Sequence, residues 1–153
     1  MKNIHDEKTL EFKGSILVAR AYPFPYGFIL DTTNEDGGNL DCFVLTNRPL
    51  NRGDIVSCSV VGLMEQFEDG EPDHNVLATF VGESVPLTES MKSKLRVFVS
   101  KVFSEMEVNP SGGDVPDYLY EKARCLKNKK IKAGKYSGIA PALSLIKQCR
   151  EKT

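Results

Sequence analysis

Short apolar runs separated by turn-forming residues fill the first half of the chain. The runs are rich in Val, Ile, Leu and Phe, and they span residues 11–19, 26–30, 42–46, 55–62 and 76–81. Asn, Asp, Gly and Pro lie between them, and these residues favour tight turns. Because no segment of helix length separates the runs, we do not expect parallel βαβ units. Strands at this spacing favour a small closed sheet, since closure removes exposed strand edges.

The period of the apolar residues changes in the second half of the chain. From Met91 onward they recur three and four residues apart, which predicts an amphipathic helix up to about Met106 with Thr88 as its N-cap. Three further segments are expected: a loop over 107–116, a short helix over 117–126, and a last helix from Ser137 with Pro141 in its first turn.

The length and the two patterns together predict one α+β domain over residues 1–153. We expect a small closed five-stranded, OB-like β-barrel over about 11–82. C-terminal helices in about 87–152 should flank this barrel, with the apolar stripe of the first helix packed on it.

Charge and cysteine usage exclude several classes of protein. Lys and Arg number 20 and Asp and Glu 21, so a globally basic nucleic-acid binder is not indicated. No apolar run approaches the ~18 residues of a membrane helix, and the charged N-terminus does not resemble a secretory signal. The four cysteines form no CxxC pair and only two histidines are present, so a zinc site is not expected. We expect reduced thiols and a cytoplasmic location.

Acidic residues gather in two turns. The first group contains Asp36 and Asp41, and the second contains Glu68, Asp69, Glu71 and Asp73. Hard oxygen ligands on loops at strand ends are what Mg²⁺ requires. Carboxylates that face one another cost free energy unless a cation lies between them. The alternative is an ordinary solvated surface, because Asp and Gly are common in turns.

Four segments in sequence order carry a family resemblance. They are YPFPYGFI at 22–29, DGGNLDCFVL at 36–45, RPLNRGDIV at 48–56 and VVGLMEQFEDGEPD at 60–73. This order resembles the family I soluble inorganic pyrophosphatases, which have a Tyr-Pro-x-x-Tyr-Gly-Phe-Ile strand, an Asp-Gly-Asp-Pro-x-Asp motif and a Val-Gly-x-x-x-x-x-Asp-Glu-Gly-Glu-x-Asp turn. The resemblance implies Mg²⁺-dependent hydrolysis of inorganic diphosphate to two phosphates by a metal-bound hydroxide, in a homo-oligomer.

The resemblance also implies roles for individual residues. Asp36, Asp41 and Asp73 correspond to metal ligands, and Glu68 stands at a ligand position where the family has Asp. Tyr26 corresponds to the tyrosine beside the nucleophilic water, so that Tyr26 and the bridging Asp41 are the expected catalytic residues. The expected substrate-binding residues are Tyr22 from the same motif, Arg20, which would share a strand face with Tyr22, and Lys13, which lies beside the position of a family arginine.

The chain departs from the family pattern at several positions. Gly38 replaces the middle aspartate of the central motif, Asn75 replaces a lysine, and the N-terminal segment with an acidic residue and a lysine is largely missing. Losing a general base typically costs ~10²–10⁴ in rate. The basic tract 122–135 could fold over the acidic site and supply replacement phosphate donors.

Two other functions stay open at this point. One is a catalytically impaired pyrophosphatase-like protein that binds metal or phosphate or serves in assembly. The other, less favoured because of the acidic turns, is an OB-type nucleic-acid binder that would use the basic tract with Tyr22, Phe24 and Phe43 as stacking groups.

Overall fold

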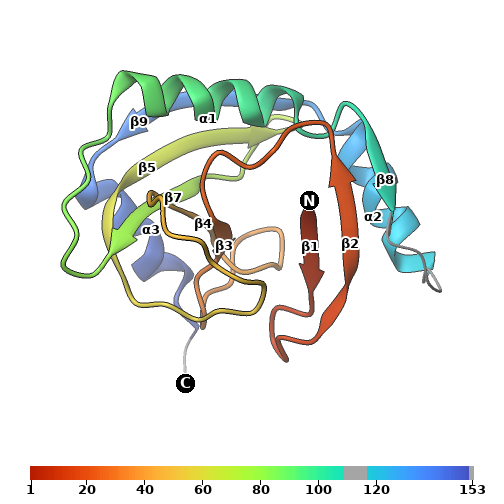
Figure 1. Cartoon of the computed structure of the whole chain (residues 1–153), viewed down its shortest axis with the longest axis horizontal. Helices are drawn as coiled ribbons and strands as arrows, with labels where there is room; N and C mark the ends of the chain where they lie inside the picture. The colour runs from red at the N-terminus through yellow and green to blue at the C-terminus, as the bar shows by residue number, and fades with distance from the viewer. Residues whose placement is uncertain (109–116, 152–153) are drawn as a thin grey trace.

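The computed structural model describes residues 1–108 and 117–151, and their strands and helices form an α+β fold (Figure 1). This confirms the predicted class. The loop expected over 107–116 lies mostly outside the described residues. None of the described helices combines the length and the apolar character needed to cross a membrane.

The larger sheet contains most of the strands predicted from the first half of the chain. In spatial order it has β3 (Tyr26–Phe28), β4 (Asp41–Val44), β7 (Asn75–Phe80), β5 (Cys58–Glu68) and β6 (Glu71–Pro72), and β5 also pairs with β9 (Ile131–Ser137). All these pairs are antiparallel except β4 with β7, which are parallel. The crossover between them runs through β5 and β6 rather than through a helix, so the absence of βαβ units agrees with the prediction.

A second sheet pairs the two N-terminal strands with a strand from the second half of the chain. It contains β1 (Lys2–His5), β2 (Phe12–Val18) and β8 (Met106–Val108), with β2 in the middle. Of these only β2 was predicted. Strands extend beyond the expected barrel range, because β1 precedes residue 11 and both β8 and β9 lie in the segment expected to be helical. The division into a barrel over about 11–82 and a helical part over about 87–152 stays a prediction. The pairings of the described strands form two sheets, and the closed five-stranded barrel stays a prediction.

The three predicted helices are present, but the first ends before the expected Met106, which belongs to β8. α1 (Glu89–Lys101) begins after Thr88, whose Oγ1 accepts a hydrogen bond from the Met91 N–H at 3.2 Å. α2 (Asp117–Asn128) and α3 (Ile139–Cys149) follow, and Pro141 lies in the first turn of α3 as predicted. α3 begins after Ser137 because residues 131–137 belong to β9.

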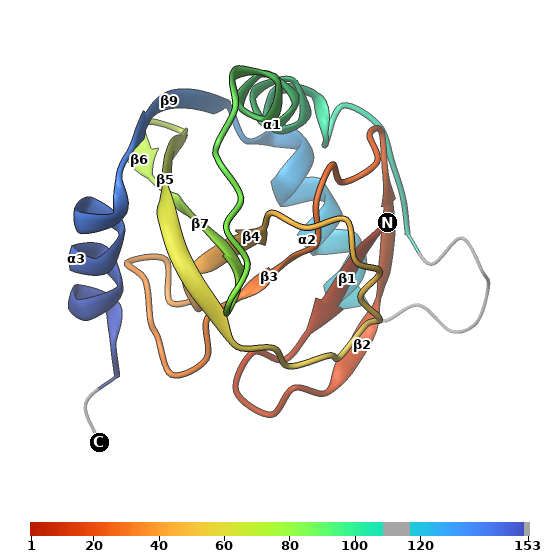
Figure 2. The ribbon, with the colours of Figure 1, turned by 60° about the vertical axis from the view of Figure 1, so that its left-hand side comes forward.

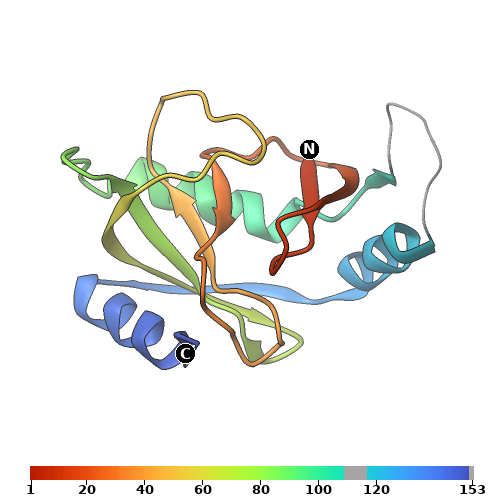
Figure 3. The same cartoon turned by 90° about the horizontal axis from the view of Figure 1, so that it is seen from below.

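The larger sheet separates two apolar clusters. Side chains alternate along β4 and β7, so Phe43 and Leu77 face one cluster whereas Cys42 and Val76 face the other. α1 and α2 contribute to the first cluster and α3 to the second. Figure 2 shows β5 and β7 between α3 on one side and α2 on the other, and Figure 3 shows β9 running from α2 to α3 along the sheet.

Candidate active site

Two of the predicted metal ligands emerge at the same end of the larger sheet. Asp41 is the first residue of β4, and Asp73 precedes β7 by two residues. β4 and β7 run parallel with Cys42 opposite Val76, so both strands start at one edge. The two carboxylates are close enough for the charge of Asp41 to raise the pKa of Asp73. The sheet therefore brings together two aspartates that are far apart in sequence.

A tight hairpin presents Glu68 to the same place. Glu68 pairs with Glu71 across the two-residue turn Asp69–Gly70, in which both residues have positive φ (51° and 83°). Asp-Gly is the favoured sequence for such a type I′ turn, because Asp tolerates and Gly freely adopts the left-handed conformation. Glu68 lies within hydrogen-bonding reach of Asp73, and its charge and hydrogen bond contribute to the raised pKa of Asp73.

Asp36 approaches from the loop before β4. Its Oδ1 accepts a hydrogen bond from the Gly38 N–H at 2.9 Å, and Gly37 takes a φ of 87° that favours glycine. The Asp36 charge raises the pKa values of both Asp41 and Asp73. The charges of Asp36, Asp41 and Glu68 thus all raise the pKa of Asp73, and the binding of a metal by these four residues stays a prediction.

The surroundings of the half-buried carboxyl groups of Asp41 and Asp73 disfavour their charged forms. Burial is the main reason that the pKa of Asp41 is raised to about 6. The Lys2 charge and a hydrogen bond from the Tyr26 hydroxyl oppose this rise. Burial, followed by the Glu68 and Asp41 charges, raises the pKa of Asp73 to about 8. A site with this excess of negative charge would gain free energy by binding a cation.

The donor chemistry fits Mg²⁺, but the described residues do not present a ready-made cage. Among residues 1–108 and 117–151, no three His, Cys, Asp or Glu side chains already stand in an arrangement that could hold a metal. Mg²⁺ usually keeps several waters and binds through one or two carboxylates, so it does not require such a cage. Asp41 and Asp73 would be the direct ligands in this arrangement, with Asp36 and Glu68 nearby.

The two predicted tyrosines line the site beside Asp41. Tyr22 and Tyr26 have ring centroids 5.3 Å apart, and Phe43 lies 4.9 Å from Tyr26. Burial and then the Asp41 charge hold the pKa of both tyrosines well above the usual value. Both hydroxyls therefore stay protonated, and Tyr26 can donate its hydrogen bond to Asp41.

Arg20 lies in a surface pocket beside α1, and Lys13 lies on the exposed side of β2. Residues 19–25 join β2 to β3 outside any strand, so the expectation that Arg20 and Tyr22 share a strand face is wrong. Arg20 instead lines a shallow surface pocket beside α1 with Lys94. Lys13 is exposed on β2 and pairs with Glu11 at 2.9 Å. Their contact with substrate stays a prediction.

The nucleic-acid alternative loses its stacking groups. Phe43 is 1% exposed and Phe24 is 8% exposed, so neither ring can stack on a base. Tyr22 packs on Phe98 with ring centroids 4.5 Å apart.

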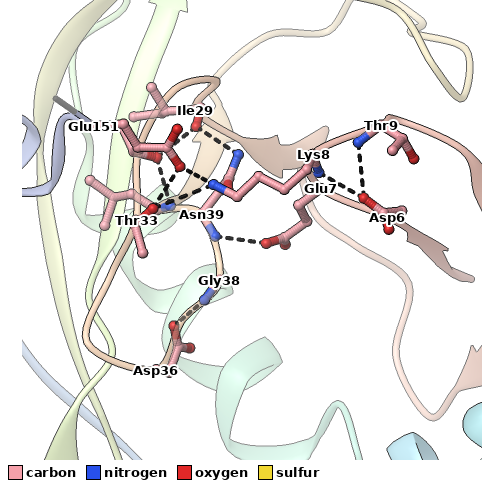
Figure 4. Close-up of polar contacts among 12 residues, drawn as sticks. Asp6, Glu7, Lys8, Thr9, Ile29, Thr33, Asp36, Gly38, Asn39 and Glu151 are labelled. Carbon is pink, nitrogen blue, oxygen red and sulfur yellow. Dashed lines mark hydrogen bonds and ion pairs between the residues drawn. The ribbon is translucent and has the colours of Figure 1, made fainter. Parts of the chain in front are cut away.

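The structure adds charged residues that the sequence interpretation missed. Lys2 on β1 places its Nζ 4.9 Å from the centroid of the Tyr26 ring. Glu7, in the turn after β1, points its carboxylate at the Gly38–Asn39 backbone (Figure 4). The available signal was short: Lys2 and Ile4 stand two residues apart, as on one face of a strand, and Asp6 follows them as a turn-forming residue.

One part of the basic tract also reaches the acidic turn. Asp69 and Lys130 exchange two hydrogen bonds, from Asp69 N to Lys130 O at 2.9 Å and from Lys130 N to Asp69 Oδ1 at 2.8 Å. The adjacent Lys129 Nζ lies 2.8 Å from Glu68 Oε2. Partial burial lowers the pKa of Lys129, but the hydrogen bond and charge of Glu68 raise it overall.

The raised pKa of Asp73 predicts a pH dependence of stability. A carboxyl group that binds its proton more tightly in the folded state loses stability as pH rises from the ordinary value towards about 8. In the absence of divalent cations, we expect the wild type to lose stability relative to Asp73→Asn as the pH rises from 5 to 8. The loss in the free energy of unfolding should be at least about 1 kcal/mol and should appear as a lower melting temperature. Thermal melts in a chelator measure this. A difference that stays constant over that range would contradict the prediction.

Comparisons with known proteins identify the family of this chain. The family model for inorganic pyrophosphatase matches residues 1–153. The inorganic pyrophosphatase of Thermoplasma volcanium is 27% identical over 123 residues, covering 79% of this chain and 62% of that protein. That of Haemophilus influenzae is 40% identical over 57 residues, covering 37% of this chain and 32% of its own. The chain thus spans less than two thirds of the length of both curated relatives.

Solved structures extend the likeness over nearly the whole chain. The inorganic pyrophosphatase from Thermus thermophilus aligns with a TM-score of 0.71 and 25% identity, covering 96% of this chain and 80% of that one. The enzyme from Helicobacter pylori aligns equally well, with a TM-score of 0.71, but at 18% identity it supports the fold alone. Because the family model matches the full length, this chain belongs to the inorganic pyrophosphatase family.

Proposed function

We propose that this chain hydrolyses inorganic diphosphate to two phosphates with Mg²⁺ as cofactor. The observation that carries the proposal is the convergence of Asp41 and Asp73, whose raised pKa values mark a half-buried site short of positive charge. Diphosphate is a multiply charged anion, so both the substrate and this site need a cation between them. Family membership supports the same reaction.

The ligands of the cation are assigned as follows. Asp41 and Asp73 would bind Mg²⁺ directly, and the other two predicted ligands, Asp36 and Glu68, would add negative charge from nearby; Glu68 is one methylene longer than Asp. The bound ion would neutralise the substrate and lower the pKa of water near it.

The other side chains would bind and orient the reactants. Tyr26 donates a hydrogen bond to Asp41 and would orient the attacking water or a phosphate oxygen. Tyr22 would extend this wall of the site, and Lys2 would add a positive charge beside it. Arg20 and Lys13, the other two predicted substrate-binding residues, would add further positive charge for the substrate.

Phosphate release from diphosphate tests the proposal. We expect release above background with Mg²⁺ and the wild-type chain. The absence of release with any of Mg²⁺, Mn²⁺, Co²⁺ or Zn²⁺ would overturn it and leave the binding or assembly role that Gly38 and Asn75 favour. Asn75 supports this alternative because its side chain carries no charge. Its buried amide instead donates a hydrogen bond to Gln66 Oε1 at 2.9 Å.

Lys129 would replace the cation that position 75 lacks. We expect Lys129→Met to raise the KM for diphosphate about tenfold, because a charged donor to phosphate is lost at a partly exposed position. Lys127→Met, an exposed lysine in α2, is the matched control and should leave KM unchanged. Steady-state kinetics measure both. Equal KM values for the two variants would contradict this role.

We also infer a homo-oligomer. Ile139 and Leu143 lie one helical turn apart on α3, with 51% and 52% of their surfaces exposed, which supports a contact with another copy. Light scattering of the full chain measures the mass; a monomer at working concentration would contradict this inference.

A further inference from the structure

The carboxylate of Glu7 fills the space beside Gly38. A Cβ atom built on Gly38 would lie 3.1 Å from Glu7 Oε2 and 3.5 Å from Asp36 Oδ1. A side chain at position 38 and the side chain of Glu7 would therefore occupy the same volume. The central motif has no acidic side chain of its own at this position, and the neighbouring strand turn supplies one.

Several contacts hold Glu7 in this place (Figure 4). Its Oε2 accepts a hydrogen bond from the Asn39 N–H at 2.6 Å. The next residue, Lys8, donates to Asn39 Oδ1 at 3.4 Å and pairs with Glu151 near the end of the described chain. Thr33 also donates to Glu151, at 2.7 Å. The turn after β1 is thus hydrogen-bonded to the loop that contains Asp36 and leads to Asp41 at the start of β4.

The turn itself is stabilised locally. Asp6 Oδ1 accepts hydrogen bonds from the N–H groups of Lys8 and Thr9, both at 2.9 Å. Asp side chains commonly close turns in this way. Glu7 is therefore presented by a closed turn, and its half-buried carboxylate adds negative charge beside Asp41.

We propose that Glu7 is a further active-site carboxylate, which takes the place of an acidic side chain at position 38 and contributes its charge to the binding of divalent cations. This role depends on the diphosphate hydrolysis proposed above. The hydrogen bond from the Asn39 N–H uses Oε2 of Glu7, and a carboxylate has a second oxygen that can accept or coordinate.

The test separates charge from structure. Glu7→Gln keeps an oxygen acceptor for the Asn39 N–H but removes the charge. Glu7→Ala with Gly38→Asp moves the carboxylate to position 38, where Gly38 has no positive φ that would strain an aspartate and the shortened residue 7 leaves room. Glu11→Gln is the control, since Glu11 is exposed at the end of the same turn.

Mn²⁺ affinity, measured by calorimetry on the full chain, is the first readout because it needs no turnover. We expect Glu7→Gln and Glu7→Ala to bind Mn²⁺ at least about fivefold more weakly, and the double variant to regain most of this loss. The rate of diphosphate hydrolysis should fall and recover in parallel, by about tenfold or more.

The outcomes distinguish the two proposals. Wild-type Mn²⁺ affinity in Glu7→Gln, or a double variant that binds no better than Glu7→Ala, would overturn the role of Glu7. A wild-type chain that binds Mn²⁺ but releases no phosphate would instead overturn the proposed hydrolysis. Thermal melts of all variants identify any that fail to fold.

Discussion

Asp41→Asn is expected to reduce diphosphate hydrolysis by about 10²–10³-fold, because it removes the carboxylate at the centre of the candidate site. Asp41 accepts the Tyr26 hydrogen bond and shares its surroundings with Asp36 and Asp73. The asparagine keeps a side-chain oxygen for Tyr26 but carries no charge to attract a cation. Steady-state phosphate release at saturating Mg²⁺ measures the loss.

The stability of this variant separates chemistry from folding. The raised pKa of Asp41 means that its charge costs free energy in the cation-free fold, so Asp41→Asn should melt at or above the wild-type temperature at pH 8. Asp31→Asn is the matched control: Asp31 is exposed, and its φ of 57° suits asparagine equally well. Activity of Asp41→Asn within about threefold of this control would contradict its assigned role.

Phe43→Ala should cause the largest loss of stability. Phe43 is 1% exposed at the centre of β4, and its ring packs on Tyr26 and edge-on against Phe98, with centroids 4.9 and 6.1 Å away. Removing a buried ring leaves a cavity and costs about 3–5 kcal/mol. The melting temperature should fall by about 10 °C for a chain of this length. Urea unfolding gives the free energy directly.

Phe12→Ala removes the same ring from an exposed position on β2 and serves as the control. Phe12 is 38% exposed and contacts Arg52, so its loss should cost about 1 kcal/mol or less. If Phe43→Ala were no more destabilising than Phe12→Ala, the cluster around β4 could not be the principal core.

Local sequence predicted those elements whose cause is local. The Thr88 cap, the apolar period of α1 and Pro141 in α3 depend on residues a few positions apart, and each agrees with the structure. The Asp69–Gly70 turn follows from the same kind of signal, whereas β6 falls inside the segment expected to be a turn. The motif order also identified the convergent acids Asp36, Asp41, Glu68 and Asp73.

Non-local pairing explains what the sequence did not predict. β9 lies in the basic tract and has little apolar alternation, yet it pairs with β5 from 63 residues or more away in sequence. Arg20 and Tyr22 do not share the expected strand face, because β2 ends at Val18. Neither result depends on an interaction between neighbouring residues.

The sequence alone determined the α+β class, the helices, the acidic turns and the family pattern, because turn chemistry and apolar period act over a few residues. Only the tertiary structure decided that Glu7 occupies the space beside Gly38 and that Lys129 pairs with Glu68. Each of these contacts joins segments more than 30 residues apart, and its geometry depends on how the sheets pack rather than on local preference.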